Sequence, residues 1–206
     1  MPKIVNKELK KMEILHAAMH VFAQKGVVNT KMIDIAQSAG IGKGTIYEYY
    51  RSKEEIFSSA YIYFFSMTKS LIQDALSKEK DPLVQLELVL KISLDAFLHL
   101  GEEYADIMMD FWAEGIRTKN QDLIESINLK GIYADYRKII QHILEKGIEK
   151  RIFKPFDTVS TASILIGAFD GIMLQWIMDR KAINFQKVTT ILLDGFIEGI
   201  KYRNNQ

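Results

Sequence analysis

Apolar residues recur at intervals of three and four along most of this chain, and that spacing is the strongest constraint on its fold. Because one turn of an α-helix contains about 3.6 residues, such spacing gives a helix one apolar face. Residues that interrupt helices are few, since proline occurs only three times in 206 residues, and strand signals are scarce. The sequence therefore predicts an all-α fold of about nine helices.

Capping residues and glycines delimit the expected helices. Gly26 and Gly40 are expected to end the first two helices, while Thr30 and Ser52 cap the starts of the second and fourth. The helices are expected to cover about residues 6–26, 30–40, 43–50, 52–78, 83–100, 102–118, 121–150, 157–180 and 184–202.

Composition favours a soluble chain with a sizeable core. Hydrophobic residues make up 48% of the sequence and cysteine is absent, so neither a disulfide framework nor a thiolate metal site is expected. The N-terminus is polar and does not resemble a signal peptide. Residues 164–178 are the most apolar run, but Asp170 and Gln175 interrupt it, and it is too short to span a bilayer. We expect a cytoplasmic protein without a membrane partner.

Charge is divided unevenly along the chain. Residues 1–53 contain nine Lys and Arg against four Asp and Glu, a net charge of +5, and the remaining residues carry a net charge of −4. A basic N-terminal segment is typical of a domain that binds a polyanion such as nucleic acid. A few solvated lysines on a small domain would give the same balance, so charge alone leaves both interpretations open.

The segment Gly40–Glu55, GIGKGTIYEYYRSKEE, contains poor helix formers where a helix is expected to start. Two short helices flanking Gly40, after a longer first helix, have the layout of a helix-turn-helix. Ala36 is small where these helices would cross, and Gly40 can adopt the positive φ of a tight turn. We therefore expect a three-helix DNA-binding domain over residues 1–53 and a second helical domain over residues 54–206, joined by the long fourth helix.

The residues of the expected third helix suit contact with a phosphate backbone. Lys43 lies in a first turn, where its charge opposes the helix dipole but unpaired N–H groups attract phosphate. Gly44 lets the backbone approach a nucleic acid closely, and the hydroxyls of Tyr47 and Tyr49 can reach phosphates. Lys53 lies in the first turn of the next helix, beside further N–H donors. If the glycines only formed a loop and the tyrosines were core, the lysines would have no explanation.

At these residues the sequence resembles the TetR family of bacterial transcriptional regulators. The resemblance covers about the first quarter of the chain and is more specific than that of a generic helix-turn-helix. The residues that carry it are Ile14-Leu15-His16-Ala17-Ala18, Phe22, Gly26, Thr30, Ile35-Ala36, Ala39-Gly40, Lys43-Gly44-Thr45-Ile46-Tyr47, Tyr50, Lys53 and Ile56.

The resemblance implies, by position, phosphate contacts from Thr30, Lys43, Tyr47, Tyr49 and Lys53, and base or groove contacts from Lys43, Gly44, Thr45 and Glu48. Glu48 suits DNA only if it accepts from a cytosine amino group, and a solvated Glu48 that points away is an equal alternative. Tyr50 replaces the usual phenylalanine of the small core, so we expect its hydroxyl to reach water or a phosphate. Gly42 replaces the usual Ser or Thr, which removes a side-chain cap.

Glycines four residues apart occur in both of the last two expected helices, at Gly167 and Gly171 and at Gly195 and Gly199. A glycine inside a helix costs up to about 1 kcal/mol relative to alanine, so these pairs require a packing reason. We expect the two helices to pair with their copies in a homodimer, as the resemblance also implies. The expected interface residues are Ile164, Ala168, Gly171, Gly195 and Gly199. Packing of the small faces inside one subunit is the alternative.

Soft and aromatic side chains are crowded on the middle helices and suggest an apolar cavity for a small molecule. The expected ligand-binding residues are Phe65, Phe97, Met108, Met109, Phe111, Trp112, Tyr133, Tyr136 and Phe169. An ordinary core is the alternative for any single one of them. Four acids on these helices could anchor a cationic or hydroxylated ligand, or face water: Asp95, Asp106, Asp110 and Asp170.

Together these features predict a homodimeric repressor that binds a palindromic operator in double-stranded DNA and releases it when a small apolar or aromatic effector binds. His16 and His20 have metal-ligand spacing, but no third ligand is evident. No arrangement of residues indicates an enzyme, so we expect no catalytic residue, metal or cofactor. Two alternatives remain: a DNA-binding protein whose C-terminal helices recruit a protein partner without an effector, and a helical enzyme with an incidentally basic end.

Overall fold

The computed structural model describes residues 7–99, residue 107 and residues 128–202. Within these ranges the chain forms eight helices and no named strand, which confirms the all-α prediction, with a helix count close to the nine expected. An isolated antiparallel bridge pairs Phe153 with Lys201. The helix expected over 102–118 and the start of the one expected over 121–150 lie outside the described residues.

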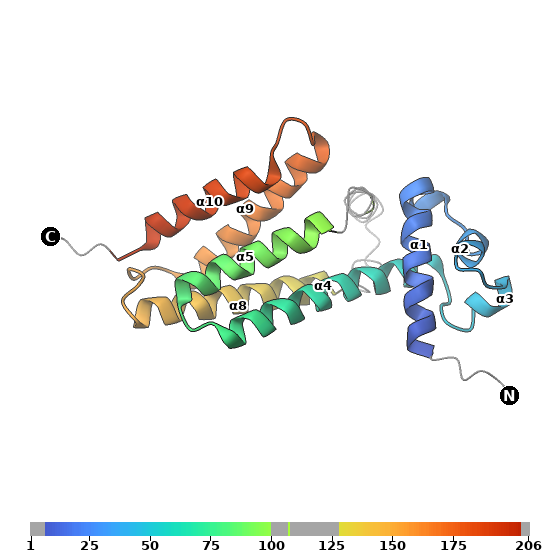
Figure 1. Cartoon of the computed structure of the whole chain (residues 1–206), viewed down its shortest axis with the longest axis horizontal. Coiled ribbons are helices and arrows are strands. Elements are labelled where there is room, and N and C mark those ends of the chain that lie inside the picture. The colour runs from blue at the N-terminus through green and yellow to red at the C-terminus, as the bar shows by residue number, and fades with distance from the viewer. Residues whose placement is uncertain (1–6, 100–106, 108–127, 203–206) are drawn as a thin grey trace. The chain divides into compact units, whose positions relative to one another are not determined.

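Figure 1 shows the helices in chain order. They are α1 (Lys7–Asn29), α2 (Met32–Ser38), α3 (Lys43–Ile46), α4 (Lys53–Lys78), α5 (Pro82–His99), α8 (Leu129–Glu149), α9 (Thr158–Met178) and α10 (Phe185–Ile200). Ser52 caps α4 as expected, because its Oγ accepts the Glu55 N–H at 3.2 Å. Asp157 and Asn184 cap α9 and α10 in the same way.

Helix α1 does not end at Gly26, where the sequence predicts its C-terminus. Gly26 adopts φ 72° and ψ 157°, which are not helical values, and the chain resumes a helical course as far as Asn29. Glycine tolerates this conformation because it has no Cβ. The prediction is therefore right about a break at Gly26 and wrong about the end of the helix, which has a kink there and three further residues.

The described chain divides into two compact units. The first contains α1, α2, α3 and the part of α4 up to Ser66, and the second contains Met67–His99 and the residues from Lys130 onward. The sequence places a domain boundary at residue 53, where α4 starts, whereas these units divide within α4. The first part of α4 packs on α1, since the ring of Phe57 lies 5.9 Å from that of Phe22 in an edge-to-face contact.

The first unit has a small core beneath α2 and α3. Its fully buried side chains include Ile14, Phe22, Ile35, Ile46 and Ile56. These residues come from all four helices of the unit, so burial of their apolar area fixes α2 and α3 on α1 and on the first part of α4.

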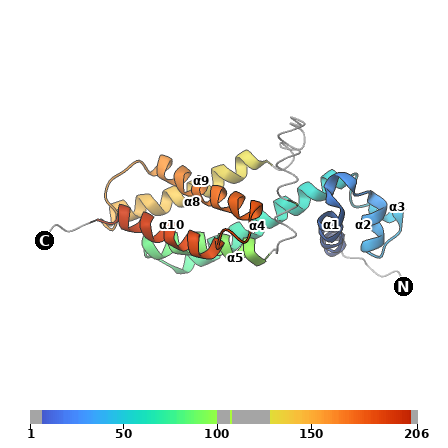
Figure 2. The same cartoon turned by 90° about the horizontal axis from the view of Figure 1, so that it is seen from above.

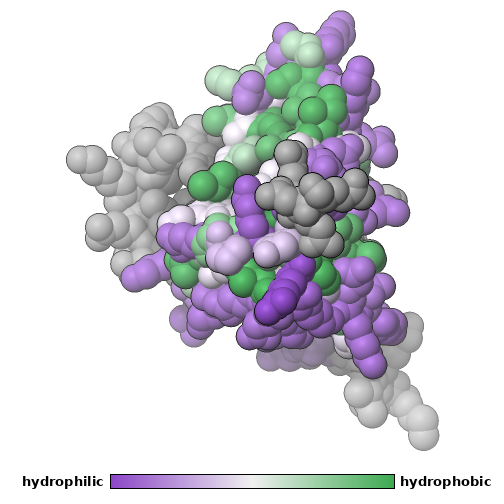
Figure 3. All heavy atoms as spheres, turned by 90° about the vertical axis from the view of Figure 1, so that its left-hand side faces the viewer, coloured by the Kyte–Doolittle hydropathy of each residue, from purple (hydrophilic) through white to green (hydrophobic). Residues whose placement is uncertain are grey.

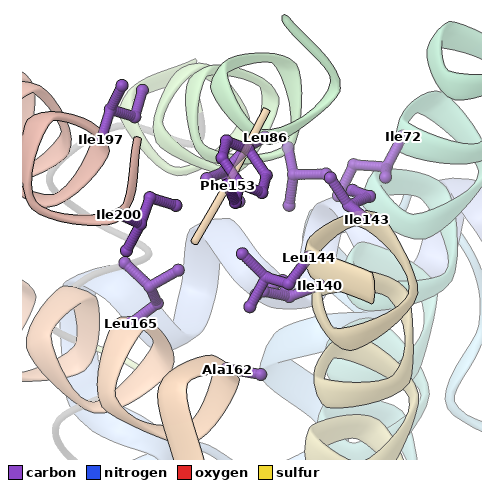
Figure 4. Packing of buried hydrophobic residues seen from close by; sticks show 11 residues of the cluster. Ile72, Leu86, Ile140, Ile143, Leu144, Phe153, Ala162, Leu165, Ile197 and Ile200 are labelled. Carbon is purple, nitrogen blue, oxygen red and sulfur yellow. The ribbon is translucent and has the colours of Figure 1, made fainter. Parts of the chain in front are cut away.

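The second unit packs α5, α8, α9, α10 and the end of α4 around one hydrophobic cluster. Figure 2 shows α9 and α10 as an antiparallel pair beside α5 and α8. Phe153 follows α8 and points among buried side chains of the cluster (Figure 4). A Cβ built on Gly147 would overlap the Phe153 ring, so the ring occupies the space that a side chain at 147 would need.

Candidate nucleic-acid interface

Helix α2 is fixed at its start by Asp34. The Lys31 N–H donates to Asp34 Oδ2 at 2.9 Å, and Lys25 Nζ of α1 lies 3.1 Å from Asp34 Oδ1. The hydrogen bond from the Lys31 backbone, followed by that from Lys25, lowers the pKa of Asp34 below its ordinary value. This acidic side chain therefore braces α2 against α1 and is already paired with a cation.

The turn between α2 and α3 has the conformation that the sequence predicts. Gly40 has φ 64°, in the left-handed region where a Cβ is disfavoured. The Ile41 N–H donates to the Ala36 carbonyl at 3.0 Å, and the Gly40 N–H donates to the Gln37 carbonyl at 3.1 Å. These bonds satisfy carbonyls at the end of α2 and reverse the chain, which fixes where α3 starts.

The start of α3 is an exposed edge of backbone and cationic side chain. Gly42 occupies the N-cap position without a side-chain hydrogen bond, as its substitution for Ser or Thr predicts. Lys43 and Gly44 are both exposed, and a Cβ built on Gly44 would meet no atom within 4 Å. Packing within the described chain therefore does not require glycine at position 44, which fits the prediction that another molecule approaches the backbone there.

The remaining predicted contacts near α3 differ in exposure. Tyr47 is 48% exposed, whereas Tyr49 and Thr45 are half-buried. Glu48 is exposed, so a base contact and a solvated side chain both remain open for it. The structure thus brings Lys43, Gly44 and Tyr47 to the same short exposed element, and the roles assigned to them stay predictions.

Thr30 does not have the position that the sequence predicts. Its side chain is 1% exposed, and its hydroxyl donates to the Gly26 carbonyl at 2.8 Å. Lys31 is the N-cap residue of α2, so the prediction that Thr30 caps this helix is wrong. The physical reason is the kink at Gly26, whose carbonyl takes the Thr30 hydroxyl as its donor. A phosphate contact from this buried side chain is not supported by the geometry.

Tyr50 also differs from its prediction. Its ring is buried, and its hydroxyl donates to the Lys11 carbonyl of α1 at 3.5 Å. Burial, followed by the charge of Glu55, raises the pKa of Tyr50 to about 12. The expectation that this hydroxyl reaches water or a phosphate is wrong, because the core of the first unit supplies a backbone acceptor.

Of the residues predicted to bind a ligand, Met108, Met109, Phe111 and Trp112 lie outside the described residues, and the others form separate groups. Phe65 contacts Tyr61 and Phe64 in the first unit. In the second unit the rings of Phe97 and Phe169 lie 5.5 Å and 5.6 Å from that of Phe185. These contacts are those of an ordinary aromatic core, so no single cavity is defined by the described members of the set.

The two tyrosines predicted to bind a ligand lie on α8 and are partly or mostly buried. The Tyr133 hydroxyl donates to Asp170 Oδ2 of α9 at 2.8 Å. Burial raises the pKa of Asp170, and the hydrogen bond from Tyr133 opposes that effect. Burial also raises the pKa of Tyr136 to about 12. Asp170 therefore does not simply face water, and within the described chain its carboxylate is oriented by Tyr133.

The residues predicted to form a dimer interface lie on the outer face of α9 and α10. Ile164 is 64% exposed, Met178 is exposed at the C-terminal end of α9, and Ile191 is exposed on α10. A Cβ built on Gly167, Gly171, Gly195 or Gly199 would meet no atom within 4 Å. Figure 3 shows hydrophobic side chains in the upper part of the view, where α9 and α10 lie. Within one described chain, therefore, these four glycines have no close-packing partner.

Helix α9 is long and apolar enough to cross a membrane by length and composition, and 11% of its most apolar stretch is buried inside the described chain. The expectation that this apolar run is too short to span a bilayer is therefore wrong, because the helix extends N-terminally to Thr158. The core helix of a soluble protein passes the same test of length and composition. The part of the chain that the structure describes contains no group of three or more His, Asp and Glu residues that could hold a metal ion.

Sequence reasoning missed the side chains that hold the helix-turn-helix in place. Lys25 pairs with Asp34, and Lys53 donates to two carbonyls at the end of α1. The spacing of nine residues between Lys25 and Asp34 gives no helical signal, because a kink and a turn separate them. The geometry of the first unit, with a Gly40 turn and an exposed cationic start of α3, defines the class of helix-turn-helix DNA-binding proteins.

Comparison with known proteins gives the family. Residues 14–60 match the model of bacterial regulatory proteins of the tetR family. The chain is 28% identical over 202 residues to the fatty acid metabolism regulator protein of Bacillus subtilis (strain 168), covering 94% of this chain and 97% of that protein. It is 25% identical over 190 residues to the probable acrEF/envCD operon repressor of Escherichia coli (strain K12), covering 90% and 84%.

A solved structure matches the fold over almost the whole chain. The transcriptional regulator FadR from Bacillus subtilis, in complex with stearoyl-CoA, superposes with a TM-score of 0.76 at 24% identity, covering 92% of this chain and 98% of that one. The helix-turn-helix, the family match and the relatives agree: residues 14–60 match bacterial regulatory proteins of the tetR family, and the chain as a whole is similar to transcriptional regulators.

Proposed function

We propose that this protein is a transcriptional repressor that binds a palindromic operator through α3. The observation that carries this proposal is the exposed start of α3, which follows the positive-φ turn at Gly40 and presents Lys43, Gly44 and Tyr47. Cationic side chains and uncapped backbone N–H groups are the donors that phosphate oxygens accept. Thr45 and Glu48 are the residues nearest to them that can read base edges.

A dimer supplies the second recognition helix that a palindrome requires. We propose that α9 and α10 pair with their copies through Ile164, Ala168, Gly171, Gly195 and Gly199. The exposed apolar side chains of both helices support this, because their burial would contribute about 25 cal/mol per Å² of apolar surface. Glycines with no close neighbour among the described residues also fit, since they let a partner helix approach closely. Two heads must then match major grooves about 34 Å apart, or a multiple of that.

The effector is proposed to be a molecule with a long apolar chain. The relative from Bacillus subtilis is a fatty acid metabolism regulator, and the FadR structure contains stearoyl-CoA. The aromatic and apolar side chains of α4, α5, α8 and α9 are compatible with an acyl chain. We propose that effector binding favours a conformation in which α4, which begins in the first unit and ends in the second, moves the heads away from the groove spacing.

The test uses the full chain, a duplex that it selects from a random pool, and a shuffled duplex of the same length. We expect salt-dependent binding with preference for the selected duplex, release on addition of stearoyl-CoA, and a rise in melting temperature with that compound alone. Saturation at a hundred times the dissociation constant would stabilise the fold by about 2.7 kcal/mol. Binding to neither duplex would contradict the proposal that this protein is a repressor. Selective binding that stearoyl-CoA and other acyl-CoAs leave unchanged would favour recruitment of a protein partner.

A further inference from the structure

The end of α1 leaves carbonyl groups that helical hydrogen bonds cannot satisfy. The last four carbonyls of any α-helix have no donor within the helix, and α1 has no basic residue in its own last turn. Side chains meet part of this need locally. Asn29 Nδ2 donates to the Lys25 carbonyl at 3.1 Å, and the Thr30 hydroxyl donates to the Gly26 carbonyl at 2.8 Å. The next two carbonyls along the chain, those of Val27 and Val28, take their donor from elsewhere.

That donor is Lys53, the first residue of α4. Its Nζ lies 2.7 Å from the Val27 carbonyl oxygen and 2.7 Å from the Val28 carbonyl oxygen. The contacts span 26 and 25 residues of sequence, so they join two elements rather than closing a local turn. An ammonium is also favourable at the negative end of a helix dipole, and hydrogen bonds to a charged donor are stronger than neutral ones.

Lys53 therefore has little donor capacity left for DNA. A lysine ammonium has three N–H donors, and two of them are directed at α1. Lys43 differs, because its side chain is exposed at the start of α3. Two lysines that the sequence treats as equivalent phosphate contacts thus have different surroundings in the structure.

We propose that Lys53 is a positioning residue, which fastens the end of α1 and the turn that leads into α2 to the first turn of α4. Helix α2 follows this turn directly and α3 follows α2, so the link fixes the recognition element with respect to the helix that leaves the first unit. Lys53 then acts on operator recognition through the placement of α3. This inference rests on the proposed DNA binding for its effect on recognition, but the link itself is a property of the protein without DNA.

The first experiment measures the link in the wild-type full chain without DNA. Lysine acetylation by acetic anhydride is followed by mass spectrometry, and the rate at Lys53 is compared with the rate at Lys43. An ammonium held by two carbonyls is expected to react several-fold more slowly than an exposed one. Equal rates at the two lysines would overturn the proposal whether or not the protein binds DNA.

The second experiment compares Lys53→Met with Lys43→Met, using the selected and shuffled duplexes at several salt concentrations. Lys53→Met keeps the apolar stem and removes the donors, so we expect the preference for the selected duplex to fall about tenfold with the salt slope unchanged. Lys43→Met is expected to weaken binding to both duplexes alike and to lower the salt slope by about 0.9, as for one lost phosphate contact.

Two outcomes of the second experiment would contradict the positioning role. One is a Lys53→Met protein with a salt slope lowered by about 0.9 and an unchanged preference, which describes a plain phosphate contact. The other is a protein indistinguishable from wild type. Hydrogen exchange of the Lys53→Met protein gives a further check, since peptides over residues 26–34 are expected to exchange faster while those of α8 do not change. If wild type binds neither duplex, the proposed function fails, and the acetylation rates still decide whether the link exists.

Discussion

Around the start of α3 the exposed surface consists of backbone, a cation and a tyrosine, whereas the outer face of α9 and α10 exposes isoleucine, methionine and glycine. The first surface can remain in water, because its polar groups are hydrated when nothing is bound. The second exposes apolar side chains and helical glycines that no neighbour in the described part of the chain covers. The difference indicates the kind of partner that each surface requires. The start of α3 suits a polyanion that binds and dissociates, and the outer face of α9 and α10 suits a protein surface that stays bound.

The largest expected effect concerns the apolar face. Gly171→Leu places a bulky side chain where the described part of a single chain leaves open space, so we expect the fold to persist and the dimer dissociation constant to rise about a hundredfold, or about 2.7 kcal/mol. Sedimentation equilibrium measures this constant. Glu87→Leu, which changes an exposed residue of α5, is the matched control and should leave it unchanged. A Gly171→Leu protein that dimerises as wild type does would remove the contrast between the two surfaces.

A second prediction distinguishes a glycine packed inside the chain from one at the apolar face. In Gly147→Ala the new methyl group would overlap the Phe153 ring, and we expect a loss of about 2 kcal/mol in unfolding free energy. In Gly167→Ala the new methyl group would meet no atom of the described residues within 4 Å, and the higher helix propensity of alanine should stabilise the chain by up to about 1 kcal/mol. Urea denaturation in the monomeric Gly171→Leu background measures both. Equal effects at the two positions would show that the packing difference has no energetic consequence.

The smallest expected effect concerns two aspartates whose pKa values are shifted in opposite directions, Asp170 within α9 and Asp157 at its start. Burial raises the folded-state pKa of Asp170, so the folded state holds its proton more tightly than the unfolded state does. Stability contributed by this group is therefore lost as pH rises from the ordinary value of 3.8 through the raised one. We expect Asp170→Asn to gain stability relative to wild type over that window, by less than about 1 kcal/mol because the site is partly solvated.

Asp157, the cap of α9, gives the opposite sign and serves as the control. Hydrogen bonds from the Ser160 side chain and backbone lower its folded-state pKa, so its contribution is present above the unfolded value and is lost as pH falls through the folded one. Asp157→Asn should therefore lose stability relative to wild type as pH rises. Thermal melts of both variants between pH 3 and 7 measure the two trends, and parallel trends would contradict the assignment.

Much of the fold follows from sequence because its signals are local. Gly40 lies between two short helical patterns, and Ser52 precedes a Glu at the capping-box position, so a turn and a helix start are predictable there and both are present. The bounds of α4, α5, α9 and α10 agree with the sequence to within a few residues for the same reason. Apolar periodicity and caps act within a few residues, which is the range over which a sequence can be interpreted directly.

Features that depend on irregular backbone geometry or on distant contacts were not predictable. Thr30 has the chemistry of a cap, but the kink at Gly26 offers its hydroxyl a carbonyl and moves the cap to Lys31. The Lys53 ammonium satisfies carbonyls 25 and 26 residues away, and no spacing rule relates these positions. The predicted ligand residues share a composition typical of a pocket, and the contacts of Phe97 and Phe169 with Phe185 could not be foreseen from it, so their part in binding a ligand stays a prediction. Side-chain type indicates a possible role, and the tertiary partner decides it.

The short bridge after α8 has a consequence for how α10 can vary. The Lys154 N–H donates to the Ile200 carbonyl at 2.9 Å, and the Tyr202 N–H donates to the Ile152 carbonyl at 2.8 Å. These main-chain bonds fix the C-terminal end of α10 lengthwise against the segment after α8. A longer or shorter loop between α9 and α10 would then be absorbed at the N-terminal end of α10, and the helix would not slide. The positions of Gly195 and Gly199 relative to the segment after α8 therefore do not change when the length of this loop changes.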